Sequence, residues 1–229
     1  GPVVCFSLFL LVFFSWKIKY MKKILLIIAF ICSAFAVNAQ TGVTWNAELG
    51  LGASGWVGDG SDNSNALFNP RVGVKIDVPL SGLLSFQTGL YWVSKGASLK
   101  EYEDLKTQVN QNYFQMPLLA AFHVGTASNF DLVLTVGPYI GYGINGKAKI
   151  DAGDYEITWN TFDDIKFETP SETAYVWQGL RRFDAGLQAG LGFDFEDWTA
   201  GINGEVSLCR IYSDGPRNVG FYASIAYKF

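Results

Sequence analysis

The sequence predicts an all-β protein, an eight-stranded antiparallel up-and-down transmembrane β-barrel. Apolar and polar residues alternate with a period of two in eight separate segments. The connections between these segments are alternately long and short, as in barrels with short periplasmic turns and longer outer loops. In each segment one face is continuously apolar, while the other is polar or rich in glycine. Together these observations indicate a barrel that faces lipid.

The composition agrees with a lipid-facing surface. Hydrophobic residues make up 49% of the 229 residues and aromatic residues 16%, including 18 Phe and 11 Tyr, while charged residues make up 17%. After the first 40 residues no run of 18 apolar residues occurs, so the expected span is made of strands rather than a helix.

The N-terminal part is predicted to be a secretory signal. Residues 21–39 contain Lys22 and Lys23, an apolar run, and small residues before an expected cleavage between Ala39 and Gln40. Residues 1–20 precede Met21 and are interpreted as an upstream or non-native extension, with a long genuine signal region as the alternative. Residues 40–229 then form the barrel domain, which reaches the outer membrane after export to the periplasm.

Charge and cysteine content exclude several classes of protein. Cleavage removes four of the 17 basic residues, which leaves 13 against 21 acidic residues and a net charge of −8. This charge argues against a nucleic-acid partner and against a polybasic lipid-binding patch. Only Cys209 remains after cleavage, so no internal disulfide is expected.

The eight segments are predicted as strands in chain order. Their ranges are Val43–Ser54, Arg71–Val78, Leu83–Ser94, Asn112–Val124, Phe130–Gly143, Arg182–Phe195, Trp198–Ile211 and Val219–Phe229. The long connections are GWVGDGSDNSNALFNP, Lys95–Gln111 and Ile144–Arg181, and YSDGPRN is of medium length. The short ones are PLSG, GTASN and Glu196-Asp197. Pro117 and Pro138 interrupt two adjacent strands at similar heights, and a local bulge is expected there.

The apolar face is predicted to point outward. A water-soluble barrel would bury that face, but here it carries large residues, whereas the opposite face is polar and glycine-rich, which suits a crowded interior. Aromatic residues on the outward face form two rings. One, near the short turns, contains Trp45, Phe86, Phe122, Phe130, Phe193, Trp198 and Phe229; the other, near the long loops, contains Trp92, Phe114, Tyr142, Phe183 and Phe221.

The last strand and two internal motifs carry resemblances to known proteins. FYASIAYKF resembles the C-terminal strand of bacterial outer-membrane proteins that the barrel assembly machinery reads. NYFQMPLLAAFHV and RRFDAGLQAGLGFDF resemble strands of the small "porin family" β-barrels of Bacteroidota, which include PorT-like proteins, over residues 21–229. That family shares a fold and an outer-membrane location but no single activity, so the resemblance implies no function and no pore.

The sequence predicts neither an enzyme nor a cofactor or metal site. His123 is the only histidine; it lies on the inward face near the periplasmic end, far from the outer half where a barrel enzyme would meet its substrate. No Cys/His metal spacing or phosphate loop occurs. The acidic DAGDYE segment lacks the spacing of a calcium loop and is expected to be solvated, with adventitious Ca²⁺ binding as the alternative.

The inward-facing charges predict a filled lumen. The expected polar network contains Glu48, Lys75, Asp77, Asp131, Arg182, Asp184 and Glu205, with Lys228 as a further cation at the rim. An eight-stranded barrel is just wide enough for side chains to fill it. Unpaired buried charges are costly, so these groups should pair with each other. A narrow polar pathway is the functional alternative.

The longest loop is the predicted partner-binding segment. Ile144–Arg181 holds seven acidic residues against three lysines and carries the candidate contact residues Tyr155, Trp159, Phe162, Tyr175 and Trp177. We expect the barrel strands to continue there as an extended hairpin or flap.

The expected function is surface interaction with an extracellular protein or glycan, or structural support of the envelope, by a monomer embedded in outer-membrane lipid. The alternatives are a narrow solute channel, an accessory barrel of a secretion system, and an outer-membrane enzyme.

Overall fold

The computed structural model describes residues 42–102, 105–125, 130–152, 155–168 and 173–229. The predicted extension 1–20, the predicted signal peptide 21–39 and the turn around 126–127 lie outside the described residues. Every described strand lies in one compact unit, Thr44–Phe229. Within the described ranges, no helix is long and apolar enough to cross a membrane.

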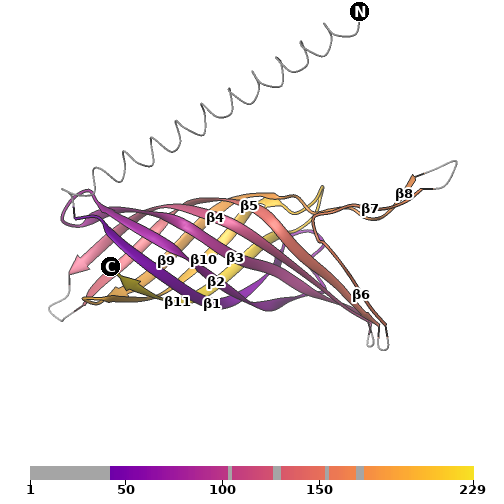
Figure 1. The fold of residues 1–229 in the computed structure, drawn as a ribbon, viewed down its shortest axis with the longest axis horizontal. Helices are drawn as coiled ribbons and strands as arrows, with labels where there is room; N and C mark the ends of the chain where they lie inside the picture. The colour runs from indigo at the N-terminus through magenta and orange to yellow at the C-terminus, as the bar shows by residue number, and fades with distance from the viewer. Residues whose placement is uncertain (1–41, 103–104, 126–129, 153–154, 169–172) are drawn as a thin grey trace, which may run out of the picture. The chain divides into compact units, whose positions relative to one another are not determined.

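Eight antiparallel strands close into a barrel, which confirms the predicted fold class (Figure 1). They are β1 (Thr44–Val57), β2 (Ser64–Pro79), β3 (Leu84–Tyr102), β4 (Leu105–Gly125), β5 (Asp131–Ala152), β9 (Phe183–Asp194), β10 (Trp198–Arg210) and β11 (Arg217–Lys228). The order around the wall is β4-β3-β2-β1-β11-β10-β9-β5, and pairing between β4 and β5 completes the ring.

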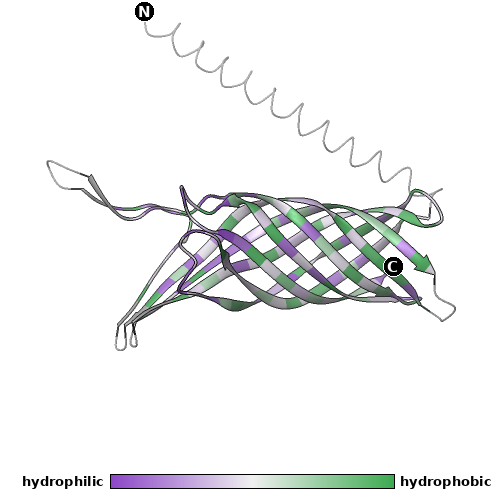
Figure 2. Ribbon diagram, turned by 180° about the vertical axis from the view of Figure 1, so that it is seen from behind, coloured by the Kyte–Doolittle hydropathy of each residue, from purple (hydrophilic) through white to green (hydrophobic). Residues whose placement is uncertain are grey.

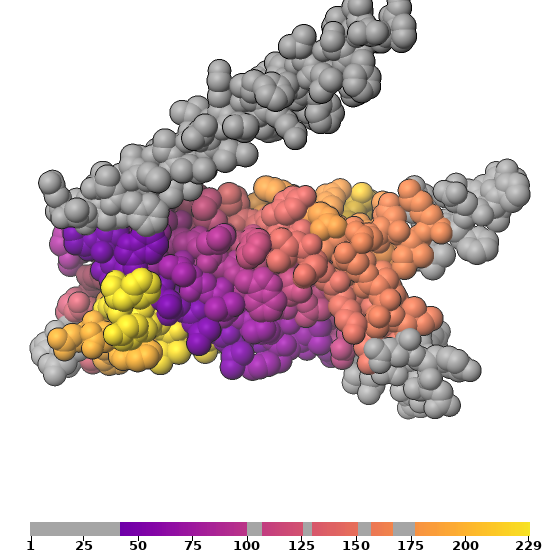
Figure 3. Space-filling model, viewed as in Figure 1, coloured from indigo at the N-terminus to yellow at the C-terminus, as the bar shows by residue number. Residues whose placement is uncertain are grey.

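The first and last strands form the closing seam. Asn46 pairs with Lys228 and Val57 with Arg217, so the whole of β11 lies along β1. In the space-filling view the indigo side chains of the early strands lie directly against the yellow side chains of the last strand (Figure 3). Both chain ends of the barrel therefore lie at the short-turn end, which in outer-membrane barrels is the periplasmic end.

Three further strands follow β5 at the long-loop end. β6 (Tyr155–Trp159) pairs with the upper part of β5, with Ile157 opposite Ile150. β7 (Ile165–Glu168) and β8 (Thr173–Trp177) form a separate two-stranded sheet. The expected continuation of barrel strands as an extended hairpin is confirmed.

The apolar face points outward, as predicted. Large apolar side chains on the outer wall are exposed, among them Leu49, Leu90, Phe114, Leu134, Ile140, Leu187 and Ile225. Nine of the twelve predicted aromatic-ring residues are among the exposed side chains, and Trp45, Trp92 and Phe130 are half-buried. In Figure 2 hydrophobic and hydrophilic positions alternate along the barrel strands. In lipid this arrangement is stable because the ring pairs its own backbone groups.

The predicted loop Lys95–Gln111 is wrong, because β3 continues to Tyr102 and β4 already begins at Leu105. The polarity of the two faces reverses in this part of the wall. Ala97, Val109 and Ala148 pair across β3, β4 and β5 and are fully buried, whereas the outward Gln108 is exposed. Strands that leave lipid for water carry their apolar side chains on the inner face and their polar ones on the outer face. The alternation therefore continues, with the two faces exchanged.

The bulge expected at the two prolines is not found at either of them. Pro117 lies opposite Tyr139 and Pro138 opposite Leu187, and the register is the same on both sides of each proline. The irregularity lies higher, between Asn112 and Tyr113, where the face polarity reverses. Thr88 Oγ1 donates a hydrogen bond of 2.8 Å to the Pro117 carbonyl, beside the position where proline has no N–H to donate to the ladder.

Candidate functional site

The centre of the barrel holds a connected set of buried polar side chains, here called the lumen cluster. Each of the eight barrel strands contributes at least one member, in chain order Glu48, Arg71, Tyr91, Lys95, Gln115, Tyr139, Asp184, Glu205 and Tyr222. Three carboxyl groups face two cationic groups. Inward-facing side chains from all eight strands therefore converge on one charged centre.

Arg71 on β2 lies between two of the carboxylates. Its Nε is 3.7 Å from Glu48 Oε1 and its Nη1 is 3.5 Å from Glu205 Oε2. Nη1 also donates to Asn203 Oδ1 at 3.3 Å. The guanidinium carbon lies 4.0 Å from the ring centroid of Tyr91, whose hydroxyl donates to Glu48 Oε2 at 3.0 Å. Arg71 is thus held by charge, hydrogen bonds and a cation–π contact at once.

Lys95 on β3 makes the shorter ion pairs. Its Nζ lies 2.8 Å from Glu205 Oε1 and 3.0 Å from Asp184 Oδ2. The Tyr139 hydroxyl accepts from Lys95 Nζ at 3.3 Å and lies 3.2 Å from Asp184 Oδ2, to which it donates. Ser207 Oγ donates to the other Asp184 oxygen, and Gln115 Nε2 donates to Glu205 Oε2 at 2.7 Å. These bonds compensate the desolvation of both carboxylates.

Glycines on neighbouring strands leave room for the aromatic members. A Cβ on Gly73 would collide with the Tyr91 ring, and one on Gly186 would lie 2.7 Å from the Tyr139 ring. The start of the RRFDAGLQAGLGFDF strand therefore has a structural explanation, because Asp184 enters the lumen cluster and Gly186 leaves space for Tyr139.

The structure brings together three of the seven predicted network residues, Glu48, Asp184 and Glu205. Lys75 and Asp77 lie lower and are half-buried, and Asp131 is exposed at the short-turn end. These positions share the inward parity but sit too far along their strands to reach the centre.

Arg182 and Lys228 also lie outside the lumen cluster. Arg182 is at the long-loop end, where it donates to the carbonyls of Gly143 and Ile144 and pairs with Asp163 at 3.1 Å. Lys228 pairs with Asp194 at 2.7 Å. Lys228 therefore lies at the rim, as expected, whereas Arg182 lies at the end of its strand rather than within the predicted network.

Sequence reasoning missed both cations of the lumen cluster. Arg71 shares the inward parity of Gly73 and Lys75, so the signal was present at the first residue of the predicted strand. Lys95 follows Ser94, where the predicted strand ended. Its parity matches Tyr91 and Val93, and a strand carried one residue further would have included it.

A second structural feature closes the long-loop end, and we call it the outer cap. Its buried members are Trp56, Ala97, Val109, Tyr113, Ala148, Phe162, Leu180 and Ile211. The Phe162 ring meets Tyr113 edge-on at 5.8 Å between centroids. Thr161 is fully buried; its Oγ1 donates to the Asn110 carbonyl at 2.8 Å, and its carbonyl accepts from Leu180 N at 3.0 Å.

The outer cap changes the interpretation of the predicted partner-binding aromatics. Phe162 is buried rather than presented to solvent, and Trp159 and Trp177 pack on each other at 5.2 Å between centroids and against the cap. The side chains of Tyr155 and Tyr175 lie outside the described residues. This segment folds back over the barrel mouth and buries its own aromatic side chains. The number of aromatic residues in the loop therefore did not show which of them are exposed.

His123 lies in a polar group near the short-turn end. Its Nε2 is 2.8 Å from Ser85 Oγ and 3.7 Å from Asp77 Oδ2, and Gln87 Nε2 donates to the same Asp77 oxygen. A catalytic triad needs the acid on the ring nitrogen opposite the nucleophile, but here both partners approach Nε2. Ser85 is also buried. Over the part of the chain that the structure describes, no group of three or more His, Cys, Asp or Glu side chains could hold a metal ion.

Comparisons with solved structures give a similar architecture at low sequence identity. OprG from Pseudomonas aeruginosa is 11% identical with a TM-score of 0.45, over 82% of this chain and 95% of that one. Ail, the attachment invasion locus protein of Yersinia pestis, is 14% identical with a TM-score of 0.41, over 81% and 98%. The outer membrane protease OmpT from Escherichia coli is 11% identical with a TM-score of 0.35, over 81% and 97%.

These structural likenesses are too distant to carry a function. No curated protein sequence matches the chain. Residues 35–212 match a protein family described as "Outer membrane protein beta-barrel domain", which covers most of the barrel and agrees with its lipid-facing wall. The chain therefore belongs to the outer membrane protein beta-barrel domain family and is located in the outer membrane.

Proposed function

We propose that the protein is a closed, non-enzymatic barrel that holds an outer strand-and-loop surface at the cell exterior, for surface interaction or support of the envelope. The observation that carries this proposal is the lumen cluster. Lys95 and Arg71 are fully enclosed between carboxylates contributed from across the lumen. An ion moving along the axis would have to separate these pairs, and each separation leaves an unpaired buried charge.

The outer cap supports the same proposal from the opposite end of the path. Thr161 and Phe162 lie over the mouth, hydrogen-bonded to β4 and packed on Tyr113. A solute that enters from outside would first have to displace this segment. Two independent obstructions in series favour display over transport.

The interaction surface is proposed to lie on the exposed strand β6 rather than on the buried aromatics of the cap. Ile157 is 62% exposed, and Thr158 beside it is also exposed. Antiparallel pairing holds β6 in a fixed register with β5, since Ile150 lies opposite Ile157. A rigid exposed strand offers a partner a preformed surface.

The narrower kinship to PorT-like porin-family barrels of Bacteroidota is also a proposal. It rests on the two strand motifs, whose Pro117 carbonyl, Asp184 and Gly186 each have a defined contact in the barrel. This kinship adds no activity to the proposed function.

A solute-flux experiment tests the proposal. Proteoliposomes that contain the refolded protein are diluted into isosmotic arabinose, and their swelling is compared with that of empty liposomes. We expect equal swelling rates for both. Swelling that rises with the amount of protein would favour the narrow solute channel instead.

A further inference from the structure

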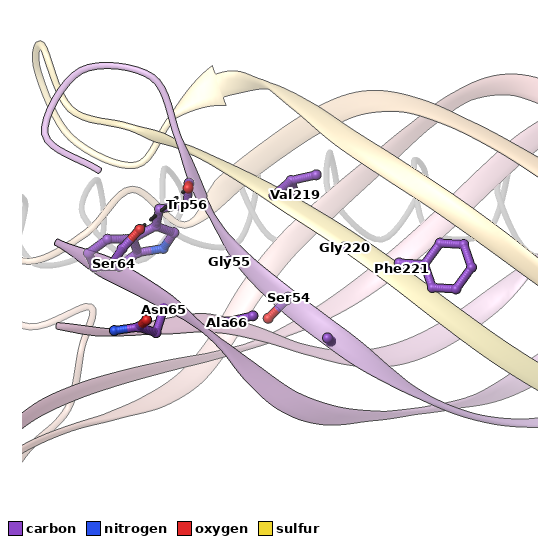
Figure 4. A pocket seen from close by; sticks show the side chains of 10 residues that line it. Ser54, Gly55, Trp56, Ser64, Asn65, Ala66, Val219, Gly220 and Phe221 are labelled. Carbon is purple, nitrogen blue, oxygen red and sulfur yellow. Dashed lines mark hydrogen bonds between the residues drawn. The ribbon is translucent and has the colours of Figure 1, made fainter. Parts of the chain in front are cut away.

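A shallow groove opens in the outer wall at the long-loop end, between β1 and β2 (Figure 4). Pairing of these strands ends at Ser54 and Leu67, whereas β1 continues along β11 as far as Val57 and Arg217. The two strands therefore diverge above Ser54. The groove has a volume of about 290 Å³.

The groove has small residues on its floor and larger apolar ones on its sides. Ala53 and Gly55 of β1 form the floor, because their outward positions carry little or no side chain. Val219 and Phe221 of β11 line one side, and Ala66 of β2 lines the other (Figure 4). Phe68, which pairs with Ala53, is 72% exposed just below. An unbranched hydrocarbon chain fits such a slot better than a flat protein face does.

The groove lies at the outer edge of the lipid-facing band. Leu208 and Phe221 are exposed apolar side chains on neighbouring strands, and the outward face then changes to Arg217 on β11 and Arg210 on β10. These two arginines lie directly opposite each other on β10 and β11, so their side chains point from the same face of the wall. The change from apolar residues to arginine places the groove in the outer leaflet, directly below a cationic pair.

The cationic pair is available to an anion. Arg210 contacts Asp59 at 3.5 Å and Asp214 at 3.6 Å, but both carboxylates are largely or fully exposed to solvent. Exposed ion pairs of this kind contribute little stability and exchange readily. Arginine binds phosphate oxygens through paired, charge-assisted hydrogen bonds. Arg217 is itself exposed, and it lies one outward position above Val219.

We propose that this site binds a phosphorylated, acylated glycolipid of the outer leaflet, of the lipid A type. One acyl chain lies in the groove over Ala53 and Gly55, and a headgroup phosphate is bound by Arg217 and Arg210. The groove and the arginines are complementary to the two ends of the same amphiphile. This charge complementarity favours a lipid over a second copy of the chain, whose apolar wall would leave the arginines unmatched.

Gly55→Leu and Arg217→Gln test the two halves of the site. A Cβ on Gly55 would lie 3.7 Å from Ala66 Cα, an ordinary contact, so leucine fills the groove without breaking the wall. Ala189→Leu is the matched control, since Ala189 is an exposed outward residue on β9, away from the groove. Refolded protein in detergent is mixed with bis-phosphorylated lipid A, and bound lipid is counted by native mass spectrometry. Heat-modifiability on gels checks the folding of each variant.

We expect one lipid A per barrel for the wild type and for Ala189→Leu, and about tenfold weaker retention for each site variant. Dephosphorylated lipid A and phosphatidylglycerol should both bind more weakly than bis-phosphorylated lipid A. Equal retention by all variants, loss in only one site variant, or equal binding of the three lipids would overturn the proposal. A barrel dimer that Gly55→Leu abolishes, with lipid retention unchanged, would assign the groove to a second copy. Should Gly55→Leu fail to fold, unchanged retention by Arg217→Gln would by itself overturn the proposal.

Discussion

Lys95 Nζ lies 2.8 Å from Glu205 Oε1, and the two residues belong to strands that are four apart in a ring of eight. The ion pair therefore spans the full width of the barrel. Side chains from opposite walls can meet only where the lumen is as narrow as an eight-stranded barrel makes it. This contact links the strand number to a filled interior.

Replacing Lys95 with Met should strongly destabilise the barrel. Asp184 and Glu205 would lose their cation in a buried site, a loss that typically costs about 3–5 kcal/mol. Urea unfolding in lipid vesicles measures the change. Lys75→Met is the control, because Lys75 is only half-buried and lies outside the lumen cluster. Equal stabilities of the two variants would mean that the lumen cluster does not hold the barrel together.

Replacing Phe162 with Ala should open the outer cap and leave the membrane barrel intact. Truncation of a buried Phe typically costs about 3–5 kcal/mol, here localised at the long-loop end. Limited proteolysis should then cleave within residues 144–181, while the heat-modifiable band persists. Ile157→Ala, at an exposed position, should leave the digestion pattern unchanged.

Gly143→Ala should have the same effect as Phe162→Ala, since its Cβ would occupy the position of the Phe162 ring. Its digestion pattern and heat-modifiability are read in the same assay. A cap that stays resistant in both variants would show that Phe162 does not hold the segment down.

An outward arginine should be tolerated on one part of β5 and not on another. Leu134 faces lipid and is 46% exposed, so Leu134→Arg should cost about 2–4 kcal/mol and impair insertion. Asn145 lies above the reversal of polarity and is exposed, so Asn145→Arg should insert like the wild type. Insertion is followed by the heat-modifiable band after folding into vesicles. Normal insertion of Leu134→Arg would place Leu134 outside the lipid.

Two deletions separate the β7–β8 hairpin from the outer cap. Removing 165–176 takes away only the two-stranded sheet, so the barrel and the cap should survive. Removing 152–171 also takes away Thr161 and Phe162, so the barrel should still fold but lose cap protection. Proteolysis and heat-modifiability of both variants measure this. A 165–176 deletion that fails to fold would show that the barrel needs the hairpin in order to fold.

Most of the barrel could be predicted from the sequence because lipid imposes one simple rule on every strand. Parity alone placed Leu134, Leu187 and Phe221 on the outer wall. The rule fails where strands enter water, since the apolar residues Ala97 and Val109 then face inward. A pattern that expects apolar residues only on the outer face therefore predicts a loop there.

The lumen cluster was harder to predict, since the alternation along a strand shows which face a side chain is on but not which other side chains it meets. Glu48 and Asp184 were placed correctly on the inner face, yet Arg182 lies too close to its strand end to meet them. The cap residue Phe162 depends on the path of the chain after β6, which no periodicity encodes.

Single-channel recording in planar bilayers tests the central claim, that the lumen cluster closes the barrel, most directly. The wild-type protein should show no discrete openings over a range of voltages. The Lys95→Ala/Glu205→Ala double variant removes the pair that spans the lumen, and Lys75→Ala serves as its control. We expect openings only when the cluster is breached and the cap is also removed by Phe162→Ala. Steady, discrete openings by the wild-type protein would contradict the account.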